Sequence, residues 1–428
     1  MKICVFGLWH LGCVTAACLA DKGYNVIGLD PNEDIVNNLN KGISPIQEPH
    51  LDELIKLKLY DNLHFTTNIQ SALKDAQIIW ITFDTLVDDN DNADEIYVKR
   101  QIMSIFPYVA NGTIVIISSQ LSVGSTRKLE KEYRNWYWFK KDVHFAYSPE
   151  NLRLGKAIAV FNNPERIIVG INDYEKGNKT IVKLLGQFCI NPDCNIIWMS
   201  PESAEMTKHA LNSFLATEVA FINEIATICE KTGANVRDVE LGLKSDSRIG
   251  YKAYLNAGSA FSGGTLARDL QFLNSIKTMP LLSSVIDSND DHKWWELNIL
   301  DEHFKYELKD KKISVLGLTY KPNTDTLRRS NSVELCKQLI KFGVNIKTYD
   351  PLIKELPKEY SHFNLCNTIE EAIRDIDAVV MMKDIKSNLE ILRCFKTPLV
   401  VIDANGILEE YLGDFKDIKY YSVGRGKI

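Results

Sequence analysis

The first 30 residues hold a strand, a glycine-flanked loop, a helix and a second strand, and this order most constrains the fold. Residues 2–7 (KICVFG) are an apolar run typical of a buried strand, and residues 11–23 have the pattern of a helix that ends at Gly23. Residues 25–30 (NVIGLD) are the predicted second strand. A strand–helix–strand unit of about 30 residues places its two strands in parallel, so we expect an α/β fold.

Further strand-like runs continue this pattern. They lie at 78–83 (IIWITF), 113–118 (TIVIIS) and 167–171 (IIVGI), with helical stretches between them. This alternation predicts a doubly wound sheet over roughly residues 1–195. A second series begins at residue 312 with KISVLGL, and its GVNIKTYDP echoes GYNVIGLDP in the first series. We therefore expect a second Rossmann-like domain.

Residues 202–232 predict one long helix between the two series. They contain no proline and no glycine, and apolar residues recur at spacings of three and four. A helix of this length usually bridges domains or forms a subunit interface. The expected fold class is α/β, with two Rossmann-like doubly wound domains joined by a long helix and a small all-helical middle domain. The expected domain boundaries are 1–199, 200–300 and 301–428.

Composition narrows the class of partner. The chain has 428 residues, more than one ordinary core supports, and its net charge of -6 without a long basic run argues against nucleic acid. No uninterrupted apolar stretch reaches the roughly 18 residues that span a bilayer. The nine cysteines show no CxxC pair and no zinc spacing, as expected of buried thiols in a reducing cytoplasm. We expect a cytoplasmic location, no membrane and no metal.

The loop after the first strand, GLWHLG, is similar to a dinucleotide-binding fingerprint. The pattern G-x-G-x-x-G needs its first glycine for a tight turn and its third for close helix–strand contact, and Gly7 and Gly12 occupy these positions. Trp9 stands at the middle position, where glycine lets the backbone approach the pyrophosphate. Asp30 ends the second strand, where a carboxylate binds ribose hydroxyls and favours NAD over NADP. Two interpretations follow: an NAD site, or a Rossmann domain that has lost its cofactor site.

Several longer stretches identify the chain as similar to the nucleotide-sugar dehydrogenases, the UDP-glucose and GDP-mannose dehydrogenase family. They are GISPIQEPHLDELI (42–55), SPENLRLGKA (148–157), SAEMTKHALNSFLATEVAFINEIA (203–226), SRIGYKAYLNAGSAFSGGTLARD (247–269) and LGLTYKPNTDTLRRS (316–330). The resemblance implies an N-terminal NAD-binding domain, a helical middle that forms a homodimer, and a C-terminal domain that holds the nucleotide. Typical members oxidise C6 of the sugar twice, from alcohol to carboxylate, with two NAD.

The family's catalytic residues match Lys208, Asn212, Asp269 and Glu150. Lys208 and Asn212 are spaced i,i+4 on the predicted long helix, so they share a face and can address one oxygen together. An ammonium and an amide donor there stabilise an alkoxide or polarise a carbonyl as hydride leaves. Asp269 is the candidate for proton transfer through water.

Three positions depart from the family pattern. Thr265 is the best match to the family's nucleophilic cysteine, and its hydroxyl needs an adjacent base before it can attack a carbonyl. Leu154 stands where the family has a second glutamate, which assists hydrolysis of the acyl-enzyme. Gln120 stands where a threonine is expected. These losses all affect the second oxidation, whereas the groups for a first oxidation remain.

The resemblance also assigns the binding residues. The cofactor-binding residues are expected to be Gly7, Trp9, His10, Leu11, Gly12, Asp30, Phe83 and Ser119. The substrate-binding residues are expected to be Leu152, Arg153, Arg248, Tyr254, Gly258, Phe261, Gly264, Lys321 and Arg328. Among these, Lys321 and Arg328 are cations suited to a diphosphate.

Two functional hypotheses follow from these residues. The first is an NAD-dependent dehydrogenase of a nucleotide sugar, most similar to the family members that act at C6 of UDP-glucose. This chain is expected to stop after one two-electron oxidation, which gives an aldehyde or a ketone, or to carry out a redox-linked isomerisation. The second is a nucleotide-sugar-binding homologue without dehydrogenase turnover, which Trp9 and Thr265 favour and Lys208, Asn212 and Asp269 oppose. The expected partners are a UDP-sugar and a second copy of the chain.

Overall fold

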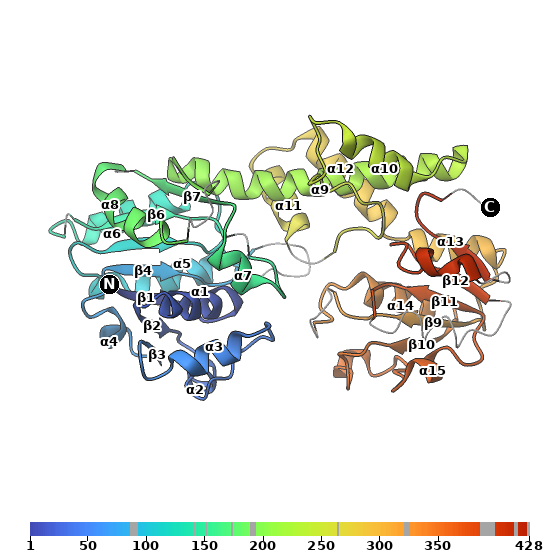
Figure 1. Cartoon of the computed structure of the whole chain (residues 1–428), viewed down its shortest axis with the longest axis horizontal. Coiled ribbons are helices and arrows are strands. Elements are labelled where there is room, and N and C mark those ends of the chain that lie inside the picture. The colour runs from blue at the N-terminus through green and yellow to red at the C-terminus, as the bar shows by residue number, and fades with distance from the viewer. Residues whose placement is uncertain are drawn as a thin grey trace. The chain divides into compact units, whose positions relative to one another are not determined.

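The computed structural model describes the chain except for residues 86–92, 141, 151, 173, 189–193, 263–264, 321–325, 386–398, 415–417 and 426–428, and it describes the backbone alone at 174–178 and 412–414. The chain divides into two compact units, Met1–Ala210 and Leu211–Ile428. Each unit is an α/β structure (Figure 1). Within the described residues, no helix combines the length and the apolar character needed to cross a bilayer.

The first unit is built on one sheet whose strands have the order β3-β2-β1-β4-β5-β6-β7-β8. All neighbouring strands are parallel except β6 and β7, which are antiparallel. The strands are β1 Lys2–Phe6, β2 Asn25–Leu29, β3 Leu63–Thr66, β4 Ile78–Ile81, β5 Ile114–Ile117, β6 His144–Tyr147, β7 Arg166–Ile171 and β8 Asn195–Met199. The strand order reverses between β1 and β4, which is where an open parallel sheet binds its ligand.

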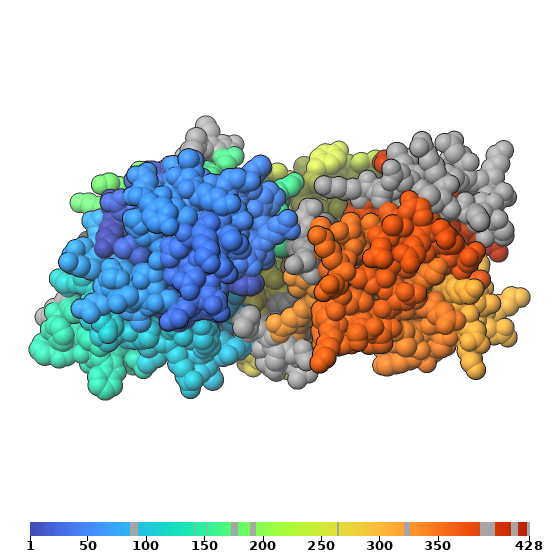
Figure 2. Space-filling view, turned by 90° about the horizontal axis from the view of Figure 1, so that it is seen from below, coloured from blue at the N-terminus to red at the C-terminus, as the bar shows by residue number. Residues whose placement is uncertain are grey.

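Helices cover both faces of this sheet, because residues along each strand alternate between two apolar clusters. Ile3 and Val5 pack into the cluster with α1, whereas Cys4 and Phe6 pack into the cluster with α5 and α6. The helices are α1 His10–Asp21, α2 Glu33–Leu39, α3 Leu51–Lys58, α4 Ile69–Leu73, α5 Glu95–Ser104, α6 Ser125–Trp136, α7 Ala157–Asn162 and α8 Tyr174–Leu185. Figure 2 shows the blue N-terminal segment, which includes α2 and α3, on the face turned towards the viewer.

Helix α1 is the most deeply placed helix of the first unit. Every residue from Leu11 to Ala20 is buried, and the helix packs against α3 and α7 as well as the sheet. Its composition explains this position, since a helix that is apolar on all sides has no face for solvent. The N-terminus of α1 is therefore held rigidly at the end of β1.

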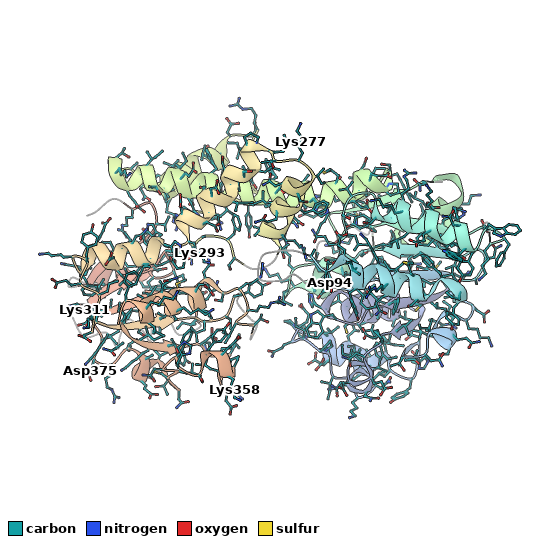
Figure 3. The ribbon with its side chains drawn as sticks, turned by 180° about the vertical axis from the view of Figure 1, so that it is seen from behind. Asp94, Lys277, Lys293, Lys311, Lys358 and Asp375 are labelled. Carbon is teal, nitrogen blue, oxygen red and sulfur yellow. The ribbon has the colours of Figure 1, made fainter. Side chains whose placement is uncertain are left out.

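The second unit holds a helical part followed by a smaller parallel sheet. Helix α9, Pro201–Thr232, begins in the first unit and ends in the second, and it is the long helix expected at 202–232. The other helices of this part are α10 Val236–Ser245, α11 Leu266–Ile276, α12 Pro280–His292 and α13 Trp295–His303. Lys277 and Lys293, labelled in Figure 3, directly follow α11 and α12.

The smaller sheet has the order β10-β9-β11-β12-β13, with all strands parallel. The strands are β9 Lys312–Leu316, β10 Asn345–Tyr349, β11 Ala378–Met381, β12 Leu399–Ile402 and β13 Ile418–Tyr421, and the helices are α14 Asn331–Lys341 and α15 Ile369–Ala372. Each of the two sheets is covered by helices, and a helical part lies between them in the sequence. This arrangement confirms the expected fold class, two Rossmann-like domains with a helical middle.

The two sheets begin with the same hydrogen-bonded unit. In the first, the Leu8 N–H donates to Oδ2 of Asp30 at 2.7 Å, and in the second the Leu318 N–H donates to Oδ2 of Asp350 at 2.8 Å. Each carboxylate lies directly after the second strand and holds the loop after the first. The echo between the two sequence segments therefore reflects a repeated local structure.

We predict opposite effects of alanine at two helical glycines. A Cβ on Gly12 in α1 would lie 1.8 Å from the carbonyl oxygen of Gly7, whereas a Cβ on Gly242 in α10 meets no atom within 4 Å. Gly12→Ala should lower the free energy of unfolding by about 1–3 kcal/mol or more, because backbone must move. Gly242→Ala should raise it by up to about 1 kcal/mol through helix propensity. Denaturant midpoints check this, and equal midpoints for both variants would contradict the packing described.

Candidate active site

The loop between β1 and α1 depends on glycine at both ends. Gly7 has φ of 102°, and a Cβ there would lie 2.7 Å from the backbone nitrogen of Phe83 at the end of β4. The missing side chain of Gly12 lets the first turn of α1 approach the Gly7 carbonyl. The loop thus lies tightly against the point where the strand order reverses, and it leads into the N-terminus of a buried helix, a position suited to an anion.

Asp30 fixes this loop from the second strand. Its carboxylate is buried and accepts hydrogen bonds from the Leu8 N–H at 2.7 Å and the Asn32 N–H at 2.9 Å. Burial raises the pKa of Asp30, and the two backbone N–H groups oppose that shift. Ser119 follows β5, and its buried hydroxyl has no hydrogen-bond partner among the described residues. These features fit a dinucleotide: a glycine cradle, a helix N-terminus, a carboxylate after β2 and an unused hydroxyl.

Trp9 takes an outward position in this loop. It is the N-cap of α1 with extended backbone angles, φ -97° and ψ -151°, so the position does not require glycine for conformational reasons. The residue is 42% exposed, whereas its neighbours Leu8 and Leu11 are buried.

A buried glutamate, Glu48, links the dinucleotide loop to the segment before α7. Its carboxylate accepts the Gly155 N–H at 2.8 Å and the Ala157 N–H at 2.9 Å, and it pairs with Nε2 of His10 at 2.9 Å. The sequence hypothesis did not select Glu48. The available signal was weak: Glu48 is the one charged residue between Gly42 and Pro49.

Lys208 and Glu150 come together within the first unit. The Lys208 ammonium donates a hydrogen bond to the backbone carbonyl of Glu150. Although part of Glu150 is solvent-accessible, its Oε1 is buried and has no hydrogen-bond partner among the described residues. Burial raises the pKa of Glu150 to about 7, the positive charge of Lys208 lowers it, and Asp84 raises it further. This carboxyl can therefore exchange a proton near neutral pH.

Two further contacts fix the start of α9. The buried carboxylate of Glu205 accepts the N–H groups of Gly124 and Thr126 and so caps the N-terminus of α6. The ring of His209 is buried, and its Nε2 lies 3.1 Å from the Leu121 carbonyl oxygen. Lys208 lies between these two anchors, so its backbone position is set by contacts on either side.

Asn212 and Asp269 come together within the second unit. The Asn212 amide in α9 donates to Oδ2 of Asp269 in α11, and both residues are buried. Nε of Arg268 lies 3.7 Å from Oδ1 of Asp269. Lys208 and Asn212 are one turn apart on the same helix, so they lie on one face of α9, as the sequence spacing predicted.

Thr265 lies at the start of α11. It is exposed, it is the N-cap residue, and its side chain makes no capping hydrogen bond. Its carbonyl oxygen accepts the Asp269 N–H at 3.2 Å. Gly263 and the predicted substrate residue Gly264 lie outside the described residues.

The segment before this loop lies against three asparagine side chains, of which Asn223 and Asn289 are buried and Asn405 is exposed. The Gly258 N–H donates to Asn223 at 3.0 Å, and a Cβ on Gly258 would lie 2.4 Å from Oδ1 of Asn405. The Phe261 N–H donates to Oδ1 of Asn289 at 2.9 Å. The sequence hypothesis did not find these asparagines, because they come from distant parts of the chain and share no motif.

Two titratable side chains also hold this segment. Nε2 of His292 lies 2.7 Å from the Gly258 carbonyl oxygen, and the Ser259 hydroxyl donates to Oε1 of Glu296 at 3.1 Å. Burial lowers the pKa of His292 and raises the pKa of Glu296 to about 7. The segment 257–261 is thus fixed at its backbone, which is suited to holding a polar ligand.

The remaining predicted substrate residues lie at several positions. Leu152 is half-buried against the core of the first unit, and Arg153 is exposed. Tyr254 is exposed, and Arg248 is exposed and paired with Asp246 at 2.7 Å. Arg328 lines an open cavity of about 450 Å³ after β9 and β10. Lys321 lies outside the described residues.

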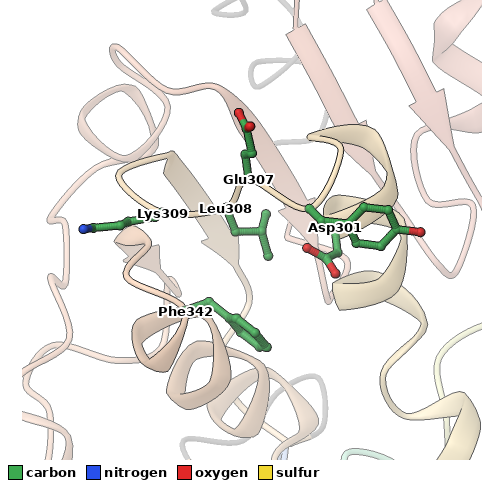
Figure 4. A pocket seen from close by; sticks show the side chains of 6 residues that line it. Asp301, Glu307, Leu308, Lys309 and Phe342 are labelled. Carbon is green, nitrogen blue, oxygen red and sulfur yellow. The ribbon is translucent and has the colours of Figure 1, made fainter.

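A second cavity lies at the opposite edge of the smaller sheet. It has a volume of about 640 Å³ and is lined by Asp301, Tyr306, Glu307, Leu308, Lys309 and Phe342 (Figure 4). These residues precede β9 or end α14, so they are at the amino edge of the strands. Ligands of such sheets bind at the carboxyl edge, and this cavity contains none of the predicted site residues.

The described cysteines offer no accessible thiol. Cys4, Cys13, Cys18, Cys194, Cys229, Cys336 and Cys366 are all buried. Burial raises the pKa of Cys13, the cysteine of α1 nearest the dinucleotide loop in sequence. Among the described residues, no group of His, Cys, Asp and Glu side chains has the arrangement of a metal site.

Comparison with known proteins agrees with this structure. Models of the UDP-glucose/GDP-mannose dehydrogenase family match the chain in three parts: the NAD binding domain at residues 1–188, the central domain at 202–291 and the UDP binding domain at 314–410. The chain therefore belongs to the UDP-glucose/GDP-mannose dehydrogenase family, and its first unit contains the family's NAD-binding domain. The finer domain boundaries expected from the sequence stay a prediction.

Individual relatives cover almost the whole chain. UDP-glucose 6-dehydrogenase of Rickettsia felis is 33% identical over 438 residues, covering 99% of this chain and 96% of that protein. UDP-glucose 6-dehydrogenase of Rhizobium meliloti is 30% identical over 447 residues, covering 99% of this chain and all of that protein. Among solved structures, the UDP-D-ManNAc dehydrogenase of Pyrococcus horikoshii aligns with a TM-score of 0.86 and 25% identity over both complete chains. The UDP-glucose dehydrogenase of Pyrobaculum islandicum has the same fold, with a TM-score of 0.85 at 24% identity, covering 99% of this chain and 98% of that one.

The raised pKa of Glu150 predicts a pH-dependent stability. A pKa of about 7 in the folded chain, against an ordinary 4.5, means that the folded state keeps a proton that the unfolded chain has lost between these values. The contribution of Glu150 to the free energy of unfolding is therefore largest below pH 4.5, and it falls as the pH rises to about 7. Glu150→Gln should unfold at a higher temperature than the wild type at pH 8, with little difference at pH 4.5.

A matched control is Glu53→Gln, because the Glu53 side chain is 76% exposed on the same unit. It should leave the melting temperature unchanged at both pH values. If the melting temperatures of Glu150→Gln and the wild type differed by the same amount at pH 4.5 and at pH 8, this result would contradict the burial of the carboxyl.

Proposed function

We propose that the chain is an NAD-dependent dehydrogenase of a UDP-sugar that stops after one two-electron oxidation, with UDP-glucose as the favoured substrate. The names of the sequence relatives, UDP-glucose 6-dehydrogenases, support the sugar and the carbon. A solved neighbour named for UDP-D-ManNAc shares the UDP part, so the nucleotide is the better supported half of the substrate. The observation that carries the limit of one oxidation is Thr265 at the position of the family's cysteine, with every described cysteine buried.

Lys208 and Asn212 are proposed to stabilise the reacting oxygen. Both lie on one face of α9, and Asp269 accepts one hydrogen of the Asn212 amide, which orients the amide and leaves its other hydrogen for an alkoxide. As the alcohol becomes a carbonyl, its hydroxyl proton passes to the ionised carboxylate of Glu150 and then to water, while the Lys208 ammonium stays charged beside the reacting oxygen. Glu150 suits this transfer because its pKa is about 7.

The residues proposed to hold NAD are those of the loop from Gly7 to Gly12, with Asp30, Phe83 and Ser119. When bound, NAD supplies the acceptor for the hydride that leaves the sugar carbon. The helix N-terminus at His10 favours the negative pyrophosphate, and Asp30 disfavours a 2′-phosphate by charge repulsion.

The second oxidation lacks its chemical groups. In the family, the aldehyde is trapped by a thiol, and a glutamate assists hydrolysis of the resulting acyl-enzyme. Here Thr265 is an exposed hydroxyl without a capping contact, and Leu154 has no proton to exchange. A hydroxyl is scarcely ionised at neutral pH, so it does not attack without a base.

A nucleotide-sugar-binding protein without turnover is the alternative function, favoured by Trp9 at the middle position of the loop and by Thr265. The two functions differ in their response to NADH. Calorimetry with UDP-glucose and NADH separates them: binding of the sugar nucleotide without any binding of NADH would select the alternative.

We predict one NADH per sugar oxidised. With UDP-glucose and excess NAD, mass spectrometry of the product should give the aldehyde, alone or as its hydrate. Lys208→Ala should lower the rate by a factor of about 100 or more, because the oxyanion loses a charged partner. Thr265→Ala should keep most of the rate, since its hydroxyl takes no part in the first step.

Formation of the uronate with two NADH would overturn this limit. The Thr265→Ala variant then distinguishes two routes to the uronate. If Thr265→Ala abolishes the uronate, the threonine replaces the cysteine as nucleophile. If Thr265→Ala still forms it, hydrated aldehyde is oxidised without a covalent intermediate.

We also propose a homodimer formed through the middle region. Phe214, Phe221 and Ile228 are exposed to 62%, 45% and 56%, and their spacing of seven places them along one stripe of α9. An apolar stripe of this length is typical of a subunit interface.

The predicted effect of breaking this stripe is a monomer. The double variant Phe221→Glu/Ile228→Glu should halve the mass in light scattering at micromolar concentration, because charges cannot be buried unpaired. Leu57→Glu is the control, since Leu57 is 70% exposed on α3. A monomeric wild type under these conditions would refute the dimer.

A further inference from the structure

An exposed aromatic cluster lies where α6 ends. Trp136, Trp138 and Phe139 are exposed to 73%, 70% and 60%, although large aromatic side chains normally contribute to cores. We call these three residues the aromatic tip. Tyr108, at the end of the short helix Phe106–Tyr108, is 45% exposed. The dehydrogenase chemistry uses none of these residues.

The aromatic tip is held outward by its neighbours. Tyr137, between the two tryptophans, stacks on the buried ring of Tyr133 with a centroid distance of 5.2 Å. The Lys140 ammonium donates to the carbonyl oxygens of Val109 at 2.6 Å and Pro107 at 3.3 Å. The loop is thus fixed at its centre and at its end, so the exposed rings do not fold back onto the core.

Basic side chains run along α6 towards the aromatic tip. Lys128 and Lys131 are exposed, are spaced i,i+3 on one face, and have no ion-pair partner among the described residues. The two arginines of the helix form ion pairs: Arg127 pairs with Glu202, and Arg134 pairs with Glu130 at 2.7 Å.

The acidic groups near the tip are few. Asp142 lies 3.3 Å from Nε2 of His144, and Glu132 is half-buried on α6. Lys128, Lys131 and Lys140 outnumber Glu132 and Asp142, so the described residues leave a small excess of positive charge here. Such an excess favours an anionic partner.

The aromatic tip lies at the sheet edge opposite the cofactor loop. It joins the end of α6 to the start of β6, and Tyr108 precedes β5, so both are at the amino edge of parallel strands. Gly7, Phe83 and Ser119 follow β1, β4 and β5, so they are at the carboxyl edge. A partner on the tip would leave the dinucleotide loop open.

We propose that the aromatic tip, with Lys128 and Lys131, binds the surface of a lipid bilayer that carries anionic headgroups. Tryptophan and phenylalanine insert at the boundary between headgroups and acyl chains, and nearby lysines are attracted to anionic lipid. Exposed aromatic rings, beside lysines that have no ion-pair partner among the described residues, match such a surface. The attachment is peripheral, reversible and weakened by salt, and it departs from the expectation, drawn from the sequence, of no membrane partner.

Flotation of the full chain with vesicles tests this proposal. The chain should float with vesicles of phosphatidylglycerol and phosphatidylcholine, should float less with phosphatidylcholine alone, and should dissociate at high salt. The triple variant Trp136→Ser/Trp138→Ser/Phe139→Ser should reduce binding by at least about tenfold, as should Lys128→Glu/Lys131→Glu. NADH binding should be unchanged in both variants, which also shows that they are folded.

The control variant is Leu57→Ser/Tyr60→Ser, which removes two side chains exposed to 70% and 78% elsewhere on the same unit. It should float like the wild type. A wild type that does not float with the anionic vesicles, or a triple variant that floats equally well, would overturn the proposal. A mass in light scattering that falls in the triple variant, without vesicle binding by the wild type, would identify the tip as a contact between copies and would also overturn it.

Discussion

Helix α9 is the element on which the candidate chemistry depends. In the first unit Glu205 and His209 bind its start to the backbone at 121–126, and in the second Asn212 and Asn223 bind it to Asp269 and the Gly258 N–H. Because the helix is uninterrupted, Lys208 and Asn212 keep a separation of one turn. These buried contacts thus hold Lys208 and Asn212, the two residues that we propose for the oxidation.

The local parts of this arrangement could be predicted from the sequence. Gly7, Gly12 and Asp30 follow from strand and helix periodicity, and Lys208 with Asn212 follows from helical spacing and the family pattern. The hydrogen bonds of Glu48 with the N–H groups of Gly155 and Ala157, and of Asn405 with the Ser259 N–H, could not be predicted, because they join residues more than 100 positions apart. Periodicity reports which face of an element is buried, and it carries no information on which distant polar groups meet there.

We propose that the departures from the family pattern affect only the second of the two oxidations. The groups proposed for the first oxidation, Lys208, Asn212, Asp269 and Glu150, contact one another in two pairs. For the second oxidation, we propose that the Thr265 hydroxyl stands in place of the family's cysteine and the Leu154 alkyl chain in place of its second glutamate. A site that keeps its oxyanion stabilisation and loses its nucleophile is suited to interconverting an alcohol and a carbonyl, because both directions use the same polarising donors.

The most direct test of this account supplies the carbonyl compound itself. Purified UDP-sugar 6-aldehyde is mixed with the chain and either NADH or NAD, and absorbance at the nicotinamide band is followed. The account predicts that NADH is consumed as the aldehyde is reduced to the alcohol, and that NAD with the aldehyde gives no NADH. Formation of NADH and the uronate from NAD and the aldehyde would contradict it.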